Sequence, residues 1–262
     1  MYKLVLTLFL AFVMTNLPAQ FQQLYEKKEF ISGGDTLRYR ILYPLNYNAD
    51  KKYPLVLFLH GAGERGNDNE AQLTHGAKLF ADSMIRQQFP AIVVFPQCPR
   101  EDFWARITRD TNKKDSLGSF AFPSEQPIGK SLGLVNQLLD TLVAGNTINT
   151  KKIYLAGLSM GGMGTFELLW RKPKFFAAAI PICGGGDPQK VTVYGRKFPI
   201  WIFHGGSDPV VPVSNSRLMY NTLQTARAKV KYTEYPGVGH DSWTNAFSEA
   251  ELLPWLFRQK KK

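Results

Sequence analysis

A serine is enclosed by glycines in the stretch GLSMG, residues 157–161, and its hydroxyl could act as a nucleophile. A serine is activated only when a base takes its proton, and it is best presented on a tight turn between a strand and a helix. Residues 151–158 are apolar and β-branched, and residues 160–170 follow a helical pattern. The turn is strained and needs small neighbours, which the glycines supply. We therefore predict that Ser159 is a nucleophile.

The base and the acid are expected further along the chain, in the order serine, acid, histidine. His240 lies in the loop YPGVGHDSW after the last predicted strand, where such a base belongs. Asp208 lies in WIFHGGSDPVVPV, 49 residues after Ser159 and 32 residues before His240. Asp241 is too close in sequence to His240 to accept its hydrogen bond easily, and Asp187 is expected to shape a turn or the pocket. We predict Ser159, Asp208 and His240 as a catalytic triad.

Three further histidines need another explanation. His60 and His204 each end a buried strand, in FLHGAG and IFHGG, and we expect both to brace the turns that follow. His75 lies in a helical segment and has no special neighbour.

Acyl transfer also needs backbone N–H groups that stabilise the oxyanion. One is expected from Met160, directly after the serine, and the other from the loop HGAGERGNDN after an early strand. Ala62 is the best candidate in that loop and Gly63 the second, because small residues allow close approach. Glu64 and Arg65 either line the site or pair with each other.

The rest of the chain alternates strand-like and helix-like segments. Continuous apolar runs are typical of buried parallel strands, so we predict a mostly parallel sheet with helices on both faces. An antiparallel hairpin precedes it, and the polar run KVKYTEYPG suits a sheet edge. The eight expected strands lie at 24–31, 36–43, 53–61, 91–97, 152–159, 177–185, 199–206 and 229–237. The expected helices lie at 71–85, 128–143, 160–172, 213–228 (with Ser214 as a possible cap) and 245–259.

One segment, residues 100–126, interrupts this alternation without a clear element. Loops of this length in compact domains are usually functional or disordered. This one is too aromatic for a linker, so we interpret it as an inserted wall or lid over a pocket. Trp104, Phe122 and, outside the insert, Trp243 could stack on an acyl group or a sugar, although simple packing is the preferred explanation for Trp243.

The N-terminus has the features of a signal peptide. One early lysine, Lys3, is followed by an apolar run and by Leu17-Pro18-Ala19. The run is too short for a comfortable membrane span, although an uncleaved anchor is the alternative. We expect cleavage after Ala19, a secreted or periplasmic protein without a stable membrane anchor, and one catalytic domain over residues 20–262.

Composition limits the possible partners. The formal net charge is +11, and removal of Lys3 with the signal peptide leaves +10. Such a protein suits an anionic polymer, for example an acidic polysaccharide. The dense basic run is confined to RQKKK at the C-terminus, and no basic stripe with interleaved aromatics supports nucleic-acid binding. No His/Cys cluster with metal-ligand spacing and no dinucleotide fingerprint is present, so we expect no metal and no cofactor.

Several motifs together resemble the α/β-hydrolase superfamily. They are YPLVLFLHGAGERGNDN, VVFPQCP, YLAGLSMGGMGTF, PICGGGDP, IFHGGSDPVVPV and GVGHDSW. Within it they look like exported bacterial esterases akin to carbohydrate esterase family 1, which includes feruloyl and acetylxylan esterases, and like predicted peptidases. The resemblance implies Ser159, Asp208 and His240 as the triad and Ala62 and Met160 as oxyanion donors.

The two cysteines, Cys98 and Cys183, follow strands that two others separate in this superfamily's sheet order. Three strand spacings put them roughly 14 Å apart. A disulfide requires Cα atoms within about 7 Å. We therefore expect two free, buried cysteines.

The leading hypothesis is a secreted serine hydrolase that cleaves feruloyl or acetyl esters on plant polysaccharide. A serine peptidase acting on short peptides is the alternative, since the same triad cleaves amides. A catalytically dead carbohydrate-binding protein is a third hypothesis, which the presence of all three triad candidates disfavours. Residues expected to touch substrate are Gly63, Glu64, Trp104, Phe122, Asp187 and Trp243.

Overall fold

The computed structural model describes residues 20–110 and 119–261. The predicted signal peptide, residues 1–19, lies outside the described residues. The strands are β1 (Glu26–Ser32), β2 (Asp35–Leu42), β3 (Tyr53–Leu59), β4 (Ile92–Pro96), β5 (Thr108–Asp110), β6 (Ser119–Ala121), β7 (Ile148–Leu158), β8 (Ala178–Ile182), β9 (Pro199–Gly205) and β10 (Lys229–Tyr235). The helices are α1 (Ala77–Ala81), α2 (Ser83–Gln88), α3 (Lys130–Ala144), α4 (Met160–Arg171), α5 (Val191–Tyr194), α6 (Ser214–Thr225), α7 (Trp243–Phe247) and α8 (Leu252–Arg258). Short 3₁₀ helices lie at Gln20–Leu24, Ala62–Glu64, Ala71–Leu73 and Pro188–Lys190.

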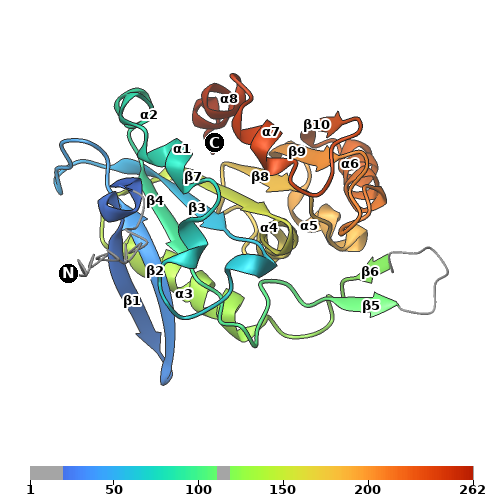
Figure 1. Cartoon of the computed structure of the whole chain (residues 1–262), viewed down its shortest axis with the longest axis horizontal. Helices are drawn as coiled ribbons and strands as arrows, with labels where there is room; N and C mark the ends of the chain where they lie inside the picture. Colours follow the sequence, from blue (N-terminus) through green and yellow to red (C-terminus); the bar gives the residue numbers. More distant parts are fainter. Residues whose placement is uncertain (1–19, 111–118, 262) are drawn as a thin grey trace, which may run out of the picture.

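Eight strands form one sheet in the order β1-β2-β4-β3-β7-β8-β9-β10 (Figure 1). β1 pairs antiparallel with β2, and β2 pairs antiparallel with β4. The remaining neighbours, from β4 to β10, are all parallel. The predicted mostly parallel sheet with an N-terminal hairpin is therefore confirmed, as is the edge position of β10.

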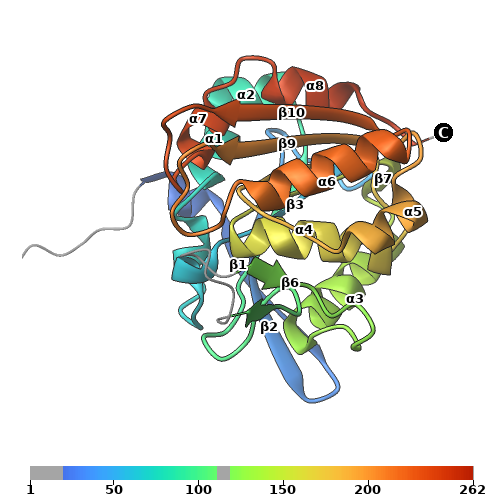
Figure 2. The ribbon, with the colours of Figure 1, turned by 90° about the vertical axis from the view of Figure 1, so that its right-hand side faces the viewer.

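Helices cover both faces of the sheet, as the continuous apolar strands predicted. Helices α3, α4, α5 and α6 lie on one face, and α1, α2, α7 and α8 lie on the other (Figure 2). Alternate residues of β3 serve the two layers: Leu55 and Leu57 join the cluster under α3 and α4, whereas Val56 and Phe58 join the cluster under α1 and α8.

The predicted helix over 71–85 is wrong, because the segment is broken into three short helices. Gly76 has a φ of 78°, which ends regular helix geometry before α1. Asp82 is extended, and its carboxylate accepts hydrogen bonds from the amides of Met84 and Ile85, so it starts α2 afresh.

Two other helix ends differ from expectation. Ser214 does not cap α6, because Val213 already has helical angles and leaves Ser214 inside the first turn. The single helix predicted over 245–259 is two helices, α7 and α8. Pro254 lies in the first turn of α8, where proline is tolerated, but it would break a continuous helix.

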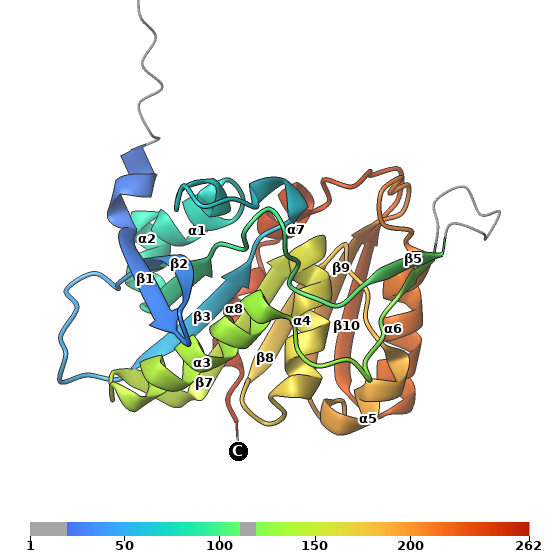
Figure 3. The same ribbon diagram turned by 90° about the horizontal axis from the view of Figure 1, so that it is seen from below.

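The segment 100–126 contains two strands that its sequence did not reveal. β5 and β6 pair antiparallel as a separate two-stranded sheet. This small sheet lies on the side of the molecule opposite β1 and β2 (Figure 3).

Cys98 follows β4 and Cys183 follows β8, with β3 and β7 between these strands. Both are free and buried, as predicted. Burial raises the pKa of the Cys98 thiol to about 12, so this thiol stays protonated at neutral pH.

Candidate active site

Ser159 occupies the tight turn between β7 and α4. Its backbone has a φ of 52° and a ψ of −117°, a strained conformation for a residue with a side chain. The Ser159 amide donates a hydrogen bond to the Ile182 carbonyl over 2.9 Å, which fixes the turn to the end of β8. The turn thus holds the serine directly before the first residue of α4, where backbone N–H groups lack partners within the helix.

Three side chains from distant parts of the sequence meet at the carboxyl ends of the parallel strands. Ser159 Oγ lies 2.9 Å from His240 Nε2, and His240 Nδ1 lies 2.7 Å from Asp208 Oδ2. Ser159 follows β7, Asp208 follows β9 and His240 follows β10. The structure thus brings together the three residues that the sequence singled out, in an order that allows proton transfer from the hydroxyl to the imidazole.

Asp208 is held from several sides. Its Oδ1 accepts hydrogen bonds from the Val210 and Val211 amides at 2.8 and 2.9 Å. Its Oδ2 faces both His240 and His204, whose Nε2 is 3.2 Å away. Burial opposes the charge of this carboxylate, but the contacts with His204, His240 and the two amides outweigh it and hold the pKa of Asp208 far below its ordinary value. Asp208 is therefore an anion at any pH near neutrality.

The loop after β3 lies against the serine turn. A Cβ built on Gly61 would be 3.6 Å from Ser159 Cβ, so Ala62, the next residue, is close to the nucleophile. Ala62, Gly63 and Glu64 form a 3₁₀ turn there, and Gly63 has open space around it. Met160 is the first residue of α4. Both predicted oxyanion donors thus lie on backbone that adjoins Ser159.

Glu64 does not pair with Arg65. Its Oε1 is 3.6 Å from His75 Nε2, and its Oε2 would be 3.0 Å from a Cβ on Gly61. The expectation that His75 has no special neighbour is therefore wrong. Glu64 ends the 3₁₀ helix after β3, and His75 lies in a bend between the 3₁₀ helix Ala71–Leu73 and α1 rather than in a helix. Helical periodicity could not show that these two segments fold back on each other.

Trp243 contacts the candidate base. Its ring lies edge-on to His240 at 5.4 Å between centroids and also touches His75 at 5.0 Å. Trp243 and His75 also line an apolar groove of about 710 Å³ between α1, α2 and α7. Leu79, Met84, Ile85 and Phe247 supply much of the apolar lining of that groove.

Trp104 requires a correction. Its side chain is fully buried, its Nε1 donates a hydrogen bond to the His60 carbonyl over 3.0 Å, and its ring packs edge-on against His60. A substrate cannot reach this side chain, so its role is to hold the start of the loop after β3 through the hydrogen bond to the His60 carbonyl. Aromatic residues in an irregular segment suggested exposure, but tertiary packing buries this one.

Phe122 and Asp187 lie together beside α4. Both line a small cavity with Met163 and Trp170. Phe122 also packs against the small apolar cluster of Ala105, Met163 and Val211. The Asp187 carboxylate accepts a hydrogen bond from the Gln189 amide and caps a turn. The expectation that Asp187 shapes a turn agrees with this geometry.

The beginning of the insert is fixed to the rest of the domain. Arg65 donates a hydrogen bond to the Arg100 carbonyl over 2.9 Å and covers the ring of Phe103. The Asp102 carboxylate accepts hydrogen bonds from the Ser131 amide and hydroxyl at 2.9 and 2.7 Å, which caps the start of α3. The loop after β3 and the beginning of the insert are therefore joined by direct contacts of Arg65.

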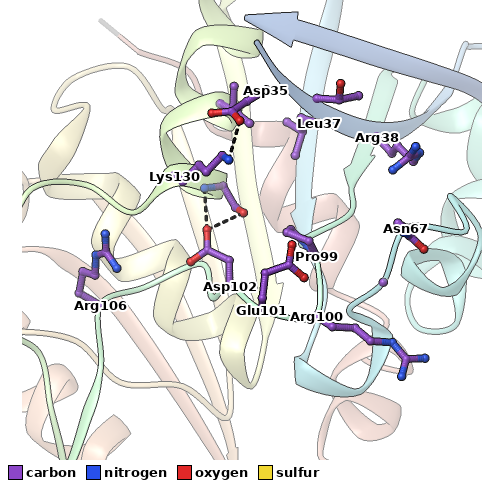
Figure 4. A pocket seen from close by; sticks show the side chains of 14 residues that line it. Asp35, Leu37, Arg38, Asn67, Pro99, Arg100, Glu101, Asp102, Arg106 and Lys130 are labelled. Carbon is purple, nitrogen blue, oxygen red and sulfur yellow. Dashed lines mark hydrogen bonds and ion pairs between the residues drawn. The ribbon is translucent and has the colours of Figure 1, made fainter. Parts of the chain in front are cut away.

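These contacts border a polar pocket of about 490 Å³ between the start of β2, the start of the insert and α3 (Figure 4). Lys130 and Asp35 form an ion pair of 2.5 Å across it. Arg100, Glu101 and Arg106 add charges of both signs to its lining. The pocket combines these charged groups with apolar surface from Leu37, Pro99 and Leu134.

One group within the described residues has potential metal ligands close together: atoms of Cys183, Asp208 and His240 lie within 4.8 Å of one another. However, Asp208 and His240 are already bonded to each other, and burial raises the pKa of the Cys183 thiol, whereas a metal needs the thiolate. The group is better suited to proton transfer than to metal binding.

Across residues 20–110 and 119–261, the helices are too short or too polar to cross a membrane.

Comparison with known proteins agrees with this geometry. Residues 45–252 match the family model described as phospholipase/carboxylesterase. Acyl-protein thioesterase 1 of Gibberella zeae is 34% identical over 227 residues, which cover 76% of this chain and 88% of that protein. A probable feruloyl esterase C of Aspergillus oryzae is 25% identical over 211 residues, or 78% of this chain and 67% of that protein.

Among solved structures, a thermostable esterase superposes with a TM-score of 0.80 at 38% identity. The match covers 92% of this chain and 64% of that one, so this chain spans slightly less than two thirds of the esterase. The family model covers most of the chain, and the sheet order and helix layers are those of an α/β-hydrolase. The chain therefore belongs to the phospholipase/carboxylesterase family of α/β-hydrolases.

Proposed function

We propose that this protein is a secreted serine esterase that hydrolyses carboxylic esters through an acyl-enzyme. The observation that carries the proposal is the continuous contact from Ser159 Oγ through His240 to Asp208, at 2.9 and 2.7 Å. Membership of an esterase family supports the reaction type. The residues take the following roles: Ser159 as nucleophile, His240 as general base and acid, and Asp208 as the group that orients the imidazole.

In the first half of the reaction, His240 Nε2 takes the proton of Ser159 while Oγ forms a bond to the ester carbonyl carbon. The carbonyl oxygen becomes an oxyanion, which the amides of Ala62 and Met160 stabilise. Because Asp208 stays ionised, it holds the Nδ1 proton of the ring and stabilises the imidazolium. His240 then donates its Nε2 proton to the alcohol oxygen as the C–O bond breaks, which leaves an acyl group on Ser159.

Water completes the second half with the same groups. His240 takes one proton of the water, the hydroxide oxygen attacks the acyl carbon, and a second oxyanion forms at Ala62 and Met160. The bond to Ser159 Oγ then breaks, and Oγ recovers its proton from His240. The carboxylic acid leaves and the free enzyme is restored.

We assign the substrate to acetyl or feruloyl esters on plant polysaccharide. The relative named a probable feruloyl esterase supports this class, as does the formal net charge of +11, which suits an acidic polymer. Apolar surface begins directly beside the candidate base, because Trp243 contacts His240 and lines the groove. Export follows from the predicted signal peptide at residues 1–19, and a single domain over 20–262 carries the activity.

The class of reaction is tested by p-nitrophenyl acetate hydrolysis by the unaltered chain and Ser159→Ala. We expect the hydrolysis rate of Ser159→Ala to be lower than that of the unaltered chain by at least about 10⁴-fold. Ser248→Ala is the control, because this exposed hydroxyl only bonds the Thr244 carbonyl and should leave the rate unchanged. Equal rates for the unaltered chain and Ser159→Ala would refute the mechanism.

The substrate class is tested by a panel of p-nitrophenyl acetate, methyl ferulate, acetylated xylan and short peptide anilides. We expect turnover of the esters with kcat/KM well above that of the peptides. Preferential turnover of the peptides would instead support a serine peptidase. Binding to xylan without turnover of any compound would indicate a carbohydrate-binding protein.

A further inference from the structure

Two buried histidines at strand ends, His60 after β3 and His204 in β9, have different hydrogen-bond surroundings. His60 Nδ1 lies 2.6 Å from the Gly61 carbonyl, and His60 Nε2 lies 3.0 Å from the Cys98 amide. One nitrogen therefore faces an acceptor and the other faces a donor. A neutral imidazole, with one N–H and one lone pair, satisfies both contacts.

Neither nitrogen of His204 faces an N–H donor: their neighbours are two acceptor oxygens and one hydroxyl. Nε2 lies 2.9 Å from the Val211 carbonyl and 3.2 Å from Asp208 Oδ2, and both of these oxygens can only accept. Nε2 must therefore carry a hydrogen. Nδ1 lies 2.7 Å from Ser216 Oγ, so the state of this nitrogen depends on where the Ser216 proton goes.

The Ser216 hydroxyl has a single proton and two neighbours. Ser216 Oγ lies 3.0 Å from the Gly184 carbonyl, which can only accept, so the hydroxyl donates there. It must then accept from His204 Nδ1. A neutral His204 would take the Ser216 proton and leave two oxygens facing each other without a hydrogen between them. Since Ser216 and His204 are both fully buried, no solvent replaces the lost bond.

The charged groups around His204 favour the same state. Asp208 approaches from the loop after β9, and Glu234 on β10 is the register partner of His204. Hydrogen bonds from Arg217 and Tyr232 lower the pKa of Glu234 to about 2, with a smaller electrostatic effect of His204. Ser216 on α6 and the Cys183 thiol after β8 contribute no charge at neutral pH. Arg217 is exposed and its guanidinium is paired with Glu234, so Asp208 is the carboxylate in direct contact with the buried ring.

We propose that His204 is an imidazolium behind Asp208 and that it acts as a positioning residue which sets the pH range of the triad. The order of contacts is then Ser159, His240, Asp208, His204. The positive ring fixes Asp208 Oδ2 and reduces the negative charge that His240 experiences, so His240 releases its proton at a lower pH. The inference rests on the proposed function, because it assigns His204 a role through His240.

The protonation state is tested directly by NMR on the full chain with ¹⁵N-labelled histidine. The sequence contains four histidines, so single substitutions assign each ring. We expect both nitrogens of His204 at the shift of protonated nitrogen from pH 5 to pH 8, and one bare nitrogen on His60. A bare nitrogen on His204 at pH 7 would overturn the proposal. The measurement needs no turnover, so it remains valid if Ser159→Ala shows that the protein is not a serine esterase.

The functional consequence is tested by the pH dependence of kcat/KM for His204→Gln. We expect loss of the positive charge to move the acid limb about one pH unit upwards. His60→Gln is the matched control, because it replaces a neutral ring and should leave the midpoint in place. A lower rate at every pH with an unchanged midpoint would show a merely structural role and would overturn the proposal. If His204→Gln does not fold, the NMR measurement on the unaltered chain still decides.

Discussion

Gly161 lies so close to Leu59 that no side chain fits between them: a Cβ on Gly161 would overlap the Leu59 carbonyl. The first turn of α4 is thus pressed onto the end of β3, which is also where the loop carrying Ala62 begins. The contact joins the serine turn to the proposed oxyanion loop. A change of one atom at this point should disturb both.

We expect Gly161→Ala to lower the free energy of unfolding by about 3 kcal/mol or more, because backbone must move to relieve the overlap. Gly63→Ala is the matched control: an added Cβ there meets no atom within 4 Å, so stability should change by less than about 0.5 kcal/mol. Urea unfolding of both variants provides the measurement. Similar midpoints for the two variants would contradict the packing argument.

Asp208→Asn should reduce kcat by about 10³- to 10⁴-fold. An amide N–H in place of Oδ2 cannot accept the Nδ1 proton of His240, so the ring would adopt the tautomer that cannot take the Ser159 proton. Asp187→Asn tests the rival acid, and asparagine can still accept from the Gln189 amide that Asp187 caps. Steady-state kinetics should therefore show little change for Asp187→Asn. A large loss there and none at position 208 would reverse the assignment.

Trp243→Ala should lower kcat/KM by about 10-fold, equivalent to about 1.4 kcal/mol, because His240 loses the ring that confines it. Trp243→Phe retains an aromatic edge and should keep most of the activity. Trp170→Ala is the control, since that ring faces Arg171 and Lys190 rather than the triad. If Trp170→Ala and Trp243→Ala lose activity equally, the effect is one of general stability.

The buried ring of His60 should make stability depend on pH. Burial lowers the pKa of His60 from 6.5 to about 4. Between these values the unfolded chain binds a proton that the folded chain does not, so the free energy of unfolding falls as pH falls, by at most about 1.4 kcal/mol per unit. His60→Gln removes this contribution. The stability difference between the two proteins should narrow from pH 7 to pH 4.5 in urea unfolding, whereas a constant difference would contradict the prediction.

The large features of the fold could be predicted because a strand that is buried on both faces of the sheet consists of consecutive apolar residues. β3, β4, β7, β8 and β9 are continuous apolar runs, and their order follows from the resemblance that the motifs carry. Short elements contain too few residues to show such a pattern. β5 and β6 have three residues each. The break at Gly76 depends on the left-handed backbone of a single residue, which the sequence pattern around it does not reveal.

The triad candidates could be selected from the sequence because their order and loop positions are restricted. Contacts between different loops were not accessible in the same way. Neither the approach of His75 to Glu64 nor the burial of Trp104 follows from local pattern, since both depend on how the chain folds over itself. His204 was expected only to brace a turn, and its spacing of four residues from Asp208 was the available signal for their contact.

Within the part of the chain that the structure describes, the two outer strands of the sheet, β1 and β10, each have one side without a neighbouring strand. β1 exposes Glu26, Lys27, Lys28 and Glu29 in succession, and β10 exposes Lys229 and Lys231. Exposed edges are templates on which other chains can add strands, and charged side chains, lysine above all, oppose this addition. The lysines and glutamates of β1 and the lysines of β10 therefore protect a long, otherwise apolar sheet against aggregation when the protein is concentrated.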